Sequence, residues 1–448
     1  MLTTDQARDR AAAIVDRARA AGADAADAVF AADTALDVSV RLGALEDVGR
    51  SESAELGLRV FVGKRSASVS TSDFTDASVA ALVDRAVAMA REAPEDAWAG
   101  LAPQERLMHG APPQLDLDDG GEASPESLRE AALAAEDAAR GVSGVTNSEG
   151  GSASASRSIW ALATSHGFAA SYATTSYGLS ASVLAGEGGA MVRDYAYHST
   201  RRRRDLESAE AIGIRAGERA VARVNPGRIE SGAMPVLFDP RVGSSLLGHL
   251  LGAISGQAIT RRTSFLLDAL GSAVFAPGVE IADDPHRPRG LRSRPFDGEG
   301  LPVSPMAIVQ DGILETWLLD SASARQLGLE PTGHAARGVG GAPGVSTGNL
   351  HMAAGHQSVQ ALLGDITRGI YVTELIGMGV NGVTGDYSRG AAGFLIENGE
   401  ITTPVAELTI AGNLKDMFRE LTPANDLEFR YATNVPTIRI DGMTIASG

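Results

Sequence analysis

Apolar positions in the first half of the chain follow two periods, one typical of helices and one typical of strands. Apolar residues three and four positions apart, such as Ile14, Val15 and Ala18, lie on one face of a helix. Ser124 and Gly141 stand where a helix cap and a helix stop are expected. The pattern predicts helices at residues 3–21, 75–92, 125–140 and 205–224.

Between these helices, apolar residues alternate with small or polar ones, which is typical of half-buried strands. Leu56, Leu58 and Val60 show this alternation within residues 28–72, where we expect several strands. Residues 156–197 predict three or four short strands separated by glycines. The breaker Asn225-Pro226-Gly227 predicts a boundary between an N-terminal α+β domain, 1–227, and a C-terminal α+β domain, 228–448.

The second half predicts another mixture of strands and helices. A strand at 234–238 precedes Asp239-Pro240, a typical helix start, and the helix should run to about Ala258. Turn dipeptides predict hairpins at 307–318, 393–404 and 437–445, the last around Asp441-Gly442. The expected fold class is α+β, with two domains whose mainly antiparallel sheets are flanked by helices.

The helix beginning at Asp239 has an unusual face. Ser244, Gly248, Gly252 and Gly256 recur every four residues and so share one side of the helix. Each glycine costs about 1 kcal/mol relative to alanine in a helix interior, so the stripe needs an explanation. Either another element packs tightly on it, or a channel or ligand passes along it. His249 lies beside the stripe, where a structural role is commoner than a ligand role.

Composition removes several classes of function. The 448 residues carry a net charge of −17, which disfavours binding to nucleic-acid phosphates. The chain has no cysteine, which excludes disulfides, thiolate nucleophiles and iron–sulfur clusters. The N-terminal residues mix acids and bases, unlike a signal peptide. The least polar stretch, 242–259, contains His249 and Gln257 and indicates a buried helix rather than a membrane span. We therefore expect a cytoplasmic protein that binds neither nucleic acid nor membrane.

Two glycine motifs match known patterns but lie in the wrong context. Gly377-x-Gly379-x-x-Gly382 matches the dinucleotide fingerprint, which requires a helix directly afterwards. Gly344-x-Ser346-x-Gly348 matches the nucleophile elbow, which requires a strand, a turn and a helix. Both segments read as glycine-rich loops. The cluster Asp283-Asp284-Pro285-His286 could hold a metal, but arginines crowd it, and a turn with internal ion pairs is preferred.

Three segments of the second half resemble the TldD/PmbA family, and within it the PmbA (TldE) branch. They are PVLFDPRVGSSLLGHLLGAISG at 235–256, DDPHRPRGLRSRPFDGEGL at 283–301 and the segment from GIYVTELIGMGVNGVTGDYSRG to AGNLKDMF at 369–418. The resemblance is strong from about Met234 onward and collinear before it. It implies zinc-dependent proteolysis by a heterodimer of a TldD and a PmbA/TldE subunit around a chamber.

The resemblance also implies where this chain departs from the zinc-bearing branch. In TldD-type chains the helix carries His-Glu-x-x-x-His, and a C-terminal cysteine completes the metal site. Those three helix positions fall here on Gly248, His249 and Ala253, and the cysteine has no counterpart. None of the eight histidines is followed by glutamate. A hydrolytic zinc needs about three protein ligands, so we expect no catalytic residue and no metal in this chain, and zinc in the partner.

The first expectation is therefore a non-catalytic subunit of a metallopeptidase complex that processes or degrades unfolded peptides. Its partners would be a TldD-like subunit and extended peptides. The segment Gly377–Gly393, with Asp386, Tyr387 and Arg389, is the expected substrate contact. One alternative is a self-standing peptide-binding homodimer without enzymatic activity. Another is a hydrolase with a different site, for instance His249 with nearby carboxylates.

Overall fold

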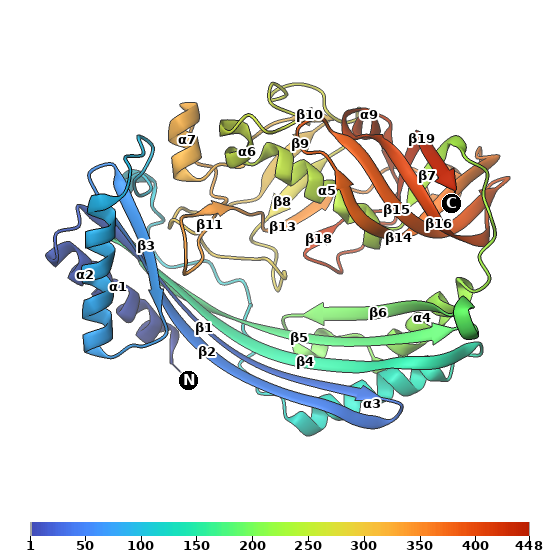
Figure 1. Ribbon diagram of the computed structural model, residues 1–448, viewed down its shortest axis with the longest axis horizontal. Helices are drawn as coiled ribbons and strands as arrows, with labels where there is room; N and C mark the ends of the chain where they lie inside the picture. The colour runs from blue at the N-terminus through green and yellow to red at the C-terminus, as the bar shows by residue number, and fades with distance from the viewer. Residues whose placement is uncertain (1, 448) are drawn as a thin grey trace.

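The computed structural model describes residues 2–447, and its N-terminal half is built on one long antiparallel sheet (Figure 1). In spatial order the strands are β3 (Arg65–Thr71), β2 (Ala44–Val62), β1 (Ala25–Arg41), β4 (Val145–Thr164), β5 (Ala169–Ala185) and β6 (Val192–Thr200). The short strands expected at 156–197 are wrong in length. Gly178, one of the glycines in this range, does not separate two strands: it lies in the middle of β5 and pairs with Ser154 and Ser199.

Four helices cover one face of this sheet, as their apolar stripes require. They are α1 (Thr4–Ala20), α2 (Asp76–Glu92), α3 (Pro125–Arg140) and α4 (Ala209–Ala222). Phe30 lies in the core under α1 and α2, and Val38 lies in the core under α3 and α4. Both are even-numbered positions of β1, so both point to the same side. Helix α4 begins later than expected because Ser208 caps it, accepting a hydrogen bond from the Ala211 N–H.

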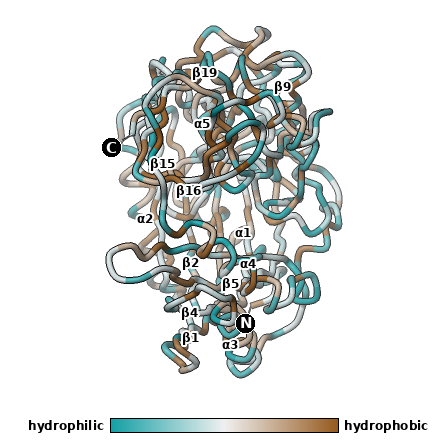
Figure 2. Tube along the Cα trace, turned by 90° about the vertical axis from the view of Figure 1, so that its right-hand side faces the viewer, coloured by the Kyte–Doolittle hydropathy of each residue, from teal (hydrophilic) through white to brown (hydrophobic). Residues whose placement is uncertain are grey.

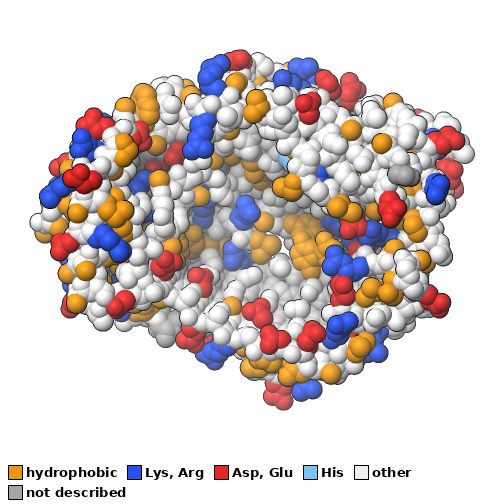
Figure 3. Space-filling model, in the orientation of Figure 1, with side chains coloured by type: hydrophobic (Ala, Val, Ile, Leu, Met, Phe, Trp, Pro, Cys, Tyr) orange, Lys and Arg blue, Asp and Glu red, His pale blue; other side chains and the backbone are white. Residues whose placement is uncertain are grey.

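The opposite face of the sheet looks toward the C-terminal half. At one end Val29 and Leu162 pack against Phe296 and Leu301. Beside them Asp27 accepts hydrogen bonds from Arg59 Nε at 2.7 Å and, across the junction, from Arg337 Nε at 3.1 Å. At the other end the halves also meet, since Asp194 of β6 pairs with Arg241 of the C-terminal half at 2.8 Å. Between these two ends the space-filling view shows a hollow (Figure 3).

The C-terminal half contains a ring of strands. The order is β16 (Glu400–Asn413), β15 (Asp386–Glu397), β14 (Arg368–Val380), β7 (Gly232–Phe238), β19 (Ile438–Ser447) and β17 (Leu421–Pro423). A further pairing of β16 with β19 closes five of these strands into a ring. The hairpin expected at 437–445 is wrong. Residues Asp441 and Gly442 form a bulge within β19, where the register shifts between Ile440 and Met443.

A second sheet, the helix α5 and several shorter helices complete the described part of this half. The sheet order is β10 (Ile313–Leu314), β9 (Met306–Gln310), β8 (Ile281–Asp284), β13 (Asn349–Met352) and β18 (Thr433–Asn434), and β11 (Ala335–Ala336) pairs with β12 (Gly344–Val345). The helices are α5 (Pro240–Ile254), α6 (Gly256–Thr260), α7 (Ser321–Leu327), α8 (Val359–Leu363) and α9 (Leu414–Arg419).

Two expected hairpins and the fold class are confirmed. Asp311-Gly312 and Asn398-Gly399 join their strands with positive φ at both residues, as tight hairpin turns require. Among the described strands only β7 with β14 and β13 with β18 pair in parallel, so the α+β class with mainly antiparallel sheets holds. No helix within residues 2–447 combines the length and apolarity needed to cross a bilayer. Figure 2 shows the apolar stretches on α5 and the neighbouring strands β15 and β16.

Candidate functional site

Helix α5 stands at the centre of the candidate site. Asp239 caps it by accepting a hydrogen bond from the Arg241 N–H at 2.9 Å. The single helix expected to reach Ala258 is wrong, because the chain breaks at Ser255 and continues as α6. Leu318 causes the break: its carbonyl accepts from the Gly256 N–H at 2.8 Å, and its N–H donates to the Ile254 carbonyl at 3.0 Å.

The glycine stripe therefore divides into two parts with different surroundings. Gly248 and Gly252 are exposed, and a side chain added at either would meet no atom within 4 Å. Gly256 is buried on α6, where an added Cβ would lie 2.2 Å from Ser323 Oγ of α7. Tight packing explains Gly256. Open space lies in front of Gly248 and Gly252, as a channel along the helix would require.

His249 and Tyr387 pack against each other beside this open face. Their rings meet edge to face, with centroids 5.9 Å apart. Burial and the nearby Arg389 charge lower the pKa of His249, so its imidazole is neutral at pH 7. Burial raises the pKa of Tyr387 to about 12. Neither His249 Nε2 nor the Tyr387 hydroxyl, both buried, has a hydrogen-bond partner within residues 2–447.

The structure does not bring the three expected substrate-contact residues together. Residues 377–393 are not one loop: they form the end of β14, a turn, and most of β15. Asp386 fixes that turn by accepting hydrogen bonds from Thr384 Oγ1 at 2.6 Å and Asn413 Nδ2 at 3.1 Å. Tyr387 is 1 % exposed and belongs to the core. Arg389 alone reaches a pocket between the two halves.

This pocket, which we call the arginine pocket, has a volume of about 300 Å³. Its lining comes from β6, the residue after α4, helix α5 and strands β14 and β15: Arg193, Asp194, Tyr195, Arg223, Arg241, Val242, Ser245, Thr373, Glu374, Leu375 and Arg389. Sequence reasoning found only Arg389, because the other residues come from distant segments that share no motif.

An ion-pair network forms one side of the arginine pocket. Asp194 is 2 % exposed and pairs with Arg241 at 2.8 Å and Arg223 at 3.1 Å, and Arg223 also pairs with Glu374. Burial alone would raise the pKa of Asp194, but its hydrogen bond to Arg241 and the two arginine charges hold that pKa below its usual value. Asp194 is therefore ionised at neutral pH.

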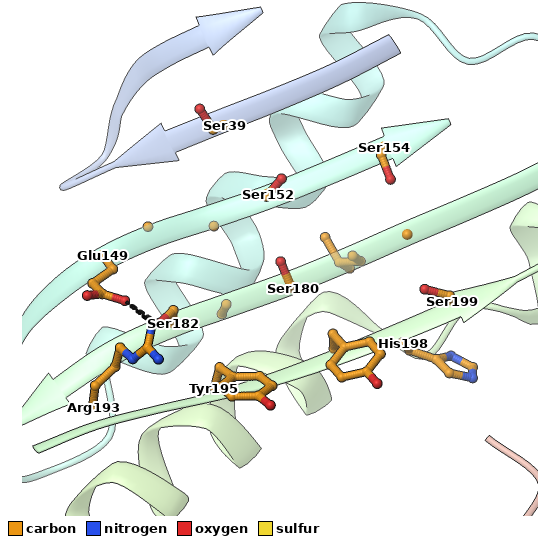
Figure 4. Close-up of a pocket in the computed structure, with 16 residues that line it drawn as sticks. Ser39, Glu149, Ser152, Ser154, Ser180, Ser182, Arg193, Tyr195, His198 and Ser199 are labelled. Carbon is orange, nitrogen blue, oxygen red and sulfur yellow. Dashed lines mark hydrogen bonds and ion pairs between the residues drawn. The ribbon is translucent and has the colours of Figure 1, made fainter. Parts of the chain in front are cut away.

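A second cavity continues from the arginine pocket along the open face of the N-terminal sheet (Figure 4). It measures about 550 Å³ and shares Arg193 and Tyr195 with the arginine pocket. Small hydroxyl side chains form its floor: Ser39, Ser152, Ser154, Ser180, Ser182 and Ser199. The rings of Tyr195 and Tyr197 are stacked along β6, with centroids 6.2 Å apart. We call this surface the serine floor.

The residues at the zinc position that the resemblance implies do not fit zinc. Of Gly248, His249 and Ala253, only His249 has a side chain able to coordinate a metal, and Ala253 lies in the core. The charge of Arg389 beside His249 further disfavours a cation. No group of three or more histidine or acidic residues within 2–447 is placed to hold a metal ion. In the cluster near β8, Asp283 Oδ2 instead lies 3.3 Å from His334 Nε2.

Models of one protein family match most of the chain. The PmbA/TldA metallopeptidase domain 1 model matches residues 26–90, the central domain model matches 118–224, and the C-terminal domain model matches 231–447. Metalloprotease PmbA of Escherichia coli O157:H7 is 40% identical over 94% of this chain and 92% of its own. The Metalloprotease PmbA homolog of Haemophilus influenzae is 37% identical over 96% and 94%.

Solved structures share the fold along its whole length. A Bacteroides thetaiotaomicron protein described as a candidate modulator of DNA gyrase superposes with a TM-score of 0.90 at 27% identity, covering 100% of both chains. TldE from Thermococcus kodakarensis superposes with a TM-score of 0.86, covering 97% of this chain and 99% of that one. At 21% identity, this second likeness shows the fold alone.

Proposed function

Because the chain belongs to the PmbA/TldD metallopeptidase family, on its PmbA branch, we propose that it is the non-catalytic subunit of a cytoplasmic zinc metallopeptidase complex. Its partner is a TldD-like chain that carries the zinc. This chain holds unfolded or extended peptides in place while the partner cleaves them. The complex thereby processes or degrades peptides that neither chain handles alone.

The observation that carries the proposal is the open face of α5. The position of one zinc ligand is Gly248, exposed and facing empty space, and the position of another is Ala253, buried in the core. A helix that had lost its ligands to ordinary drift would regain stability by filling the gap, since alanine is about 1 kcal/mol better than glycine. Open space kept at this cost is expected where a substrate chain must pass.

The walls of the hollow suit an extended polypeptide of varied sequence. The serine floor offers hydroxyls and glycine backbone, with the Glu149–Arg193 pair at its edge and the stacked rings of Tyr195 and Tyr197 beside it (Figure 4). Such a surface can hydrogen-bond to a peptide backbone without selecting particular side chains. This supports a role in positioning substrate rather than in recognising one sequence.

The test compares the purified chain, a TldD-like chain from the same genome, and their mixture. We expect zinc to follow the partner, and hydrolysis of an unfolded peptide to require both chains. Activity with stoichiometric zinc in this chain alone would overturn the proposal. A stable homodimer that binds peptide and ignores the partner would favour the alternative of a self-standing binding protein.

Replacing His249, the one ionisable residue at the expected zinc-motif positions, tests the alternative that this chain is itself a hydrolase with a different site. If His249 acted as a general base in this chain, His249→Gln would abolish any hydrolysis that the chain performs. Under the proposal, the mixture of His249→Gln with the TldD-like chain keeps its activity, because the chemistry lies in the partner. Circular dichroism of the variant controls for folding.

A further inference from the structure

We propose that the arginine pocket binds the C-terminal carboxylate of a peptide whose preceding residues lie on the serine floor. This proposal names the end of the substrate that this subunit holds. It rests on the proposed function, from which we take it that the substrate is a peptide. Three features of the pocket carry it: an unpaired cation, a buried donor without a partner, and the shape of the cavity.

The charges of the pocket leave one cation without a partner. Arg223 and Arg241 are paired with Asp194 and Glu374. Arg193 is paired with Glu149 at 3.4 Å. Arg389 has no carboxylate within ion-pair distance among the described residues, and its Nε makes only a long 3.4 Å hydrogen bond to the Ile376 carbonyl. The pocket therefore carries one uncompensated positive charge, on Arg389. The carboxylate of a ligand would neutralise it.

Thr373 provides the second feature. It lies at a bulge of β14, where the register with β15 shifts between Val372 and Glu374. A bulge turns a side chain away from its regular direction, and here Thr373 lines the pocket. The residue is 7 % exposed, yet its hydroxyl has no hydrogen-bond partner in residues 2–447. Because buried polar groups are almost always paired, a ligand is the expected partner.

A second buried donor atom in a pocket residue also lacks a hydrogen-bond partner. Arg241 Nε is buried without a hydrogen-bond partner and lies 4.0 Å from Asp239 Oδ1, whereas the other nitrogens of this guanidinium donate to Asp194. Residues that carry donors, Arg241 of α5, Thr373 of β14 and Arg389 of β15, thus line one small pocket. A carboxylate with two oxygens can accept several such hydrogen bonds at once, and charged hydrogen bonds of this kind are the stronger ones.

The shape of the cavity favours the end of a chain over an internal acidic residue. Its volume of about 300 Å³ is at the lower end for ligand pockets, which suits one terminal residue. Tyr195, Val242 and Leu375 offer apolar surface for that residue's side chain. The residues of the peptide that precede its C-terminal residue need space outside the pocket. The serine floor, which shares Arg193 and Tyr195 with the pocket, provides that space.

The first experiment measures binding of the full chain to fluorescent peptides by anisotropy. One unstructured peptide of serine, alanine and glycine ends in leucine with a free carboxylate, and a second ends in leucine amide. A third is the amide with an internal glutamate. We expect the free acid to bind at least about tenfold more tightly than either amide, since a charged hydrogen bond is worth about one such factor.

Variants locate the binding in the arginine pocket. Arg389→Gln removes the unpaired charge and should weaken binding of the free acid about tenfold, without affecting the amide. Thr373→Val is nearly isosteric and should weaken binding of the acid while leaving Tm unchanged or raised, because it removes an unpaired buried hydroxyl. Arg129→Gln on the outer side of α3 is the matched control and should change nothing.

The results of these experiments test the carboxylate site independently of the proposed function. Equal binding of the acid and the amide peptides would overturn the carboxylate site, even if the mixture with a TldD-like chain is active. So would an Arg389→Gln variant that binds the free acid as tightly as the wild type does. Tight binding of the glutamate-containing amide overturns the assignment to a chain end. Selective binding of the acid by a chain that never activates a partner would sustain the carboxylate site and overturn the proposed function.

Discussion

Glu299 is a carboxyl group enclosed where the two halves of the molecule meet. It is 5 % exposed and accepts hydrogen bonds from the Ser321 N–H at 2.8 Å and the Ser321 hydroxyl at 2.6 Å. Burial and the neighbouring charge of Asp297 raise its pKa to about 7. The folded protein therefore retains a proton that the unfolded chain releases at lower pH.

This proton makes stability depend on pH in a defined direction. Between the ordinary value of 4.5 and about 7 the folded state binds more protons, so the free energy of unfolding falls as pH rises through that window. The shift corresponds to about 3 kcal/mol. We expect Glu299→Gln, which still accepts from Ser321, to remove most of this loss.

Urea denaturation at pH 5 and pH 8 measures the effect. The wild-type protein should lose more stability between these pH values than Glu299→Gln. Glu130→Gln, at an exposed site on α3, should behave as the wild type does. An equal pH dependence in the wild type and Glu299→Gln would show that Glu299 is ionised in the folded protein.

Single residues differ in how far the sequence could reveal them. Arg389 could be selected because it follows a glycine-rich segment in a region of family resemblance. Thr373 could not, since its orientation depends on a bulge that forms only when β14 pairs with β15. The environment of Glu299 likewise depends on residues that are distant in the chain, and no local pattern reports it.

At the scale of the element, α5 makes a prediction about its own glycines. Alanine at Gly248 or Gly252 meets no atom within 4 Å and should stabilise the protein by about 1 kcal/mol each through helix propensity. Alanine at Gly256 would lie 2.2 Å from Ser323 Oγ and should destabilise it. Thermal denaturation of the three variants tests this, and stabilisation by Gly256→Ala would contradict it.

The two ends of the same helix differ in whether local sequence can predict them. The start at Asp239-Pro240 follows from capping chemistry within a few residues, and the structure confirms it. The break at Ser255 comes from hydrogen bonds with Leu318, which is distant in the chain. For the same reason the sequence predicts a turn at Asp441-Gly442 where the structure has a bulge, because only the pairing of β19 with β7 decides between the two.

At the scale of the molecule, Asp27 links the two halves through a buried charge cluster. Asp27 is 2 % exposed and holds Arg59 and Arg337, which are also buried. Asp27→Asn leaves both guanidinium groups without a compensating charge and should cost about 3–5 kcal/mol. Calorimetry measures this loss. Asp33→Asn, at an exposed position on the same strand, should have little effect, and a similar loss in both variants would refute a specific role for Asp27.

The α+β class could be predicted because strand and helix periods are local properties. The closing of β16 on β19 and the docking of the two halves could not, since they depend on pairings between distant segments. The arginine pocket follows the same rule, because it exists only after β6 and α4 have met α5 and β14.

The closed ring of strands also sets an order in which the chain can mature during synthesis. The strands of the N-terminal sheet have all been made once residue 200 has left the ribosome. Strand β7, at residues 232–238, must wait for β19, at 438–447, before its antiparallel edge is covered. Until then the nascent chain exposes an apolar strand edge of the kind that chaperones protect. We therefore expect the C-terminal half to depend on such assistance far more than the N-terminal half does.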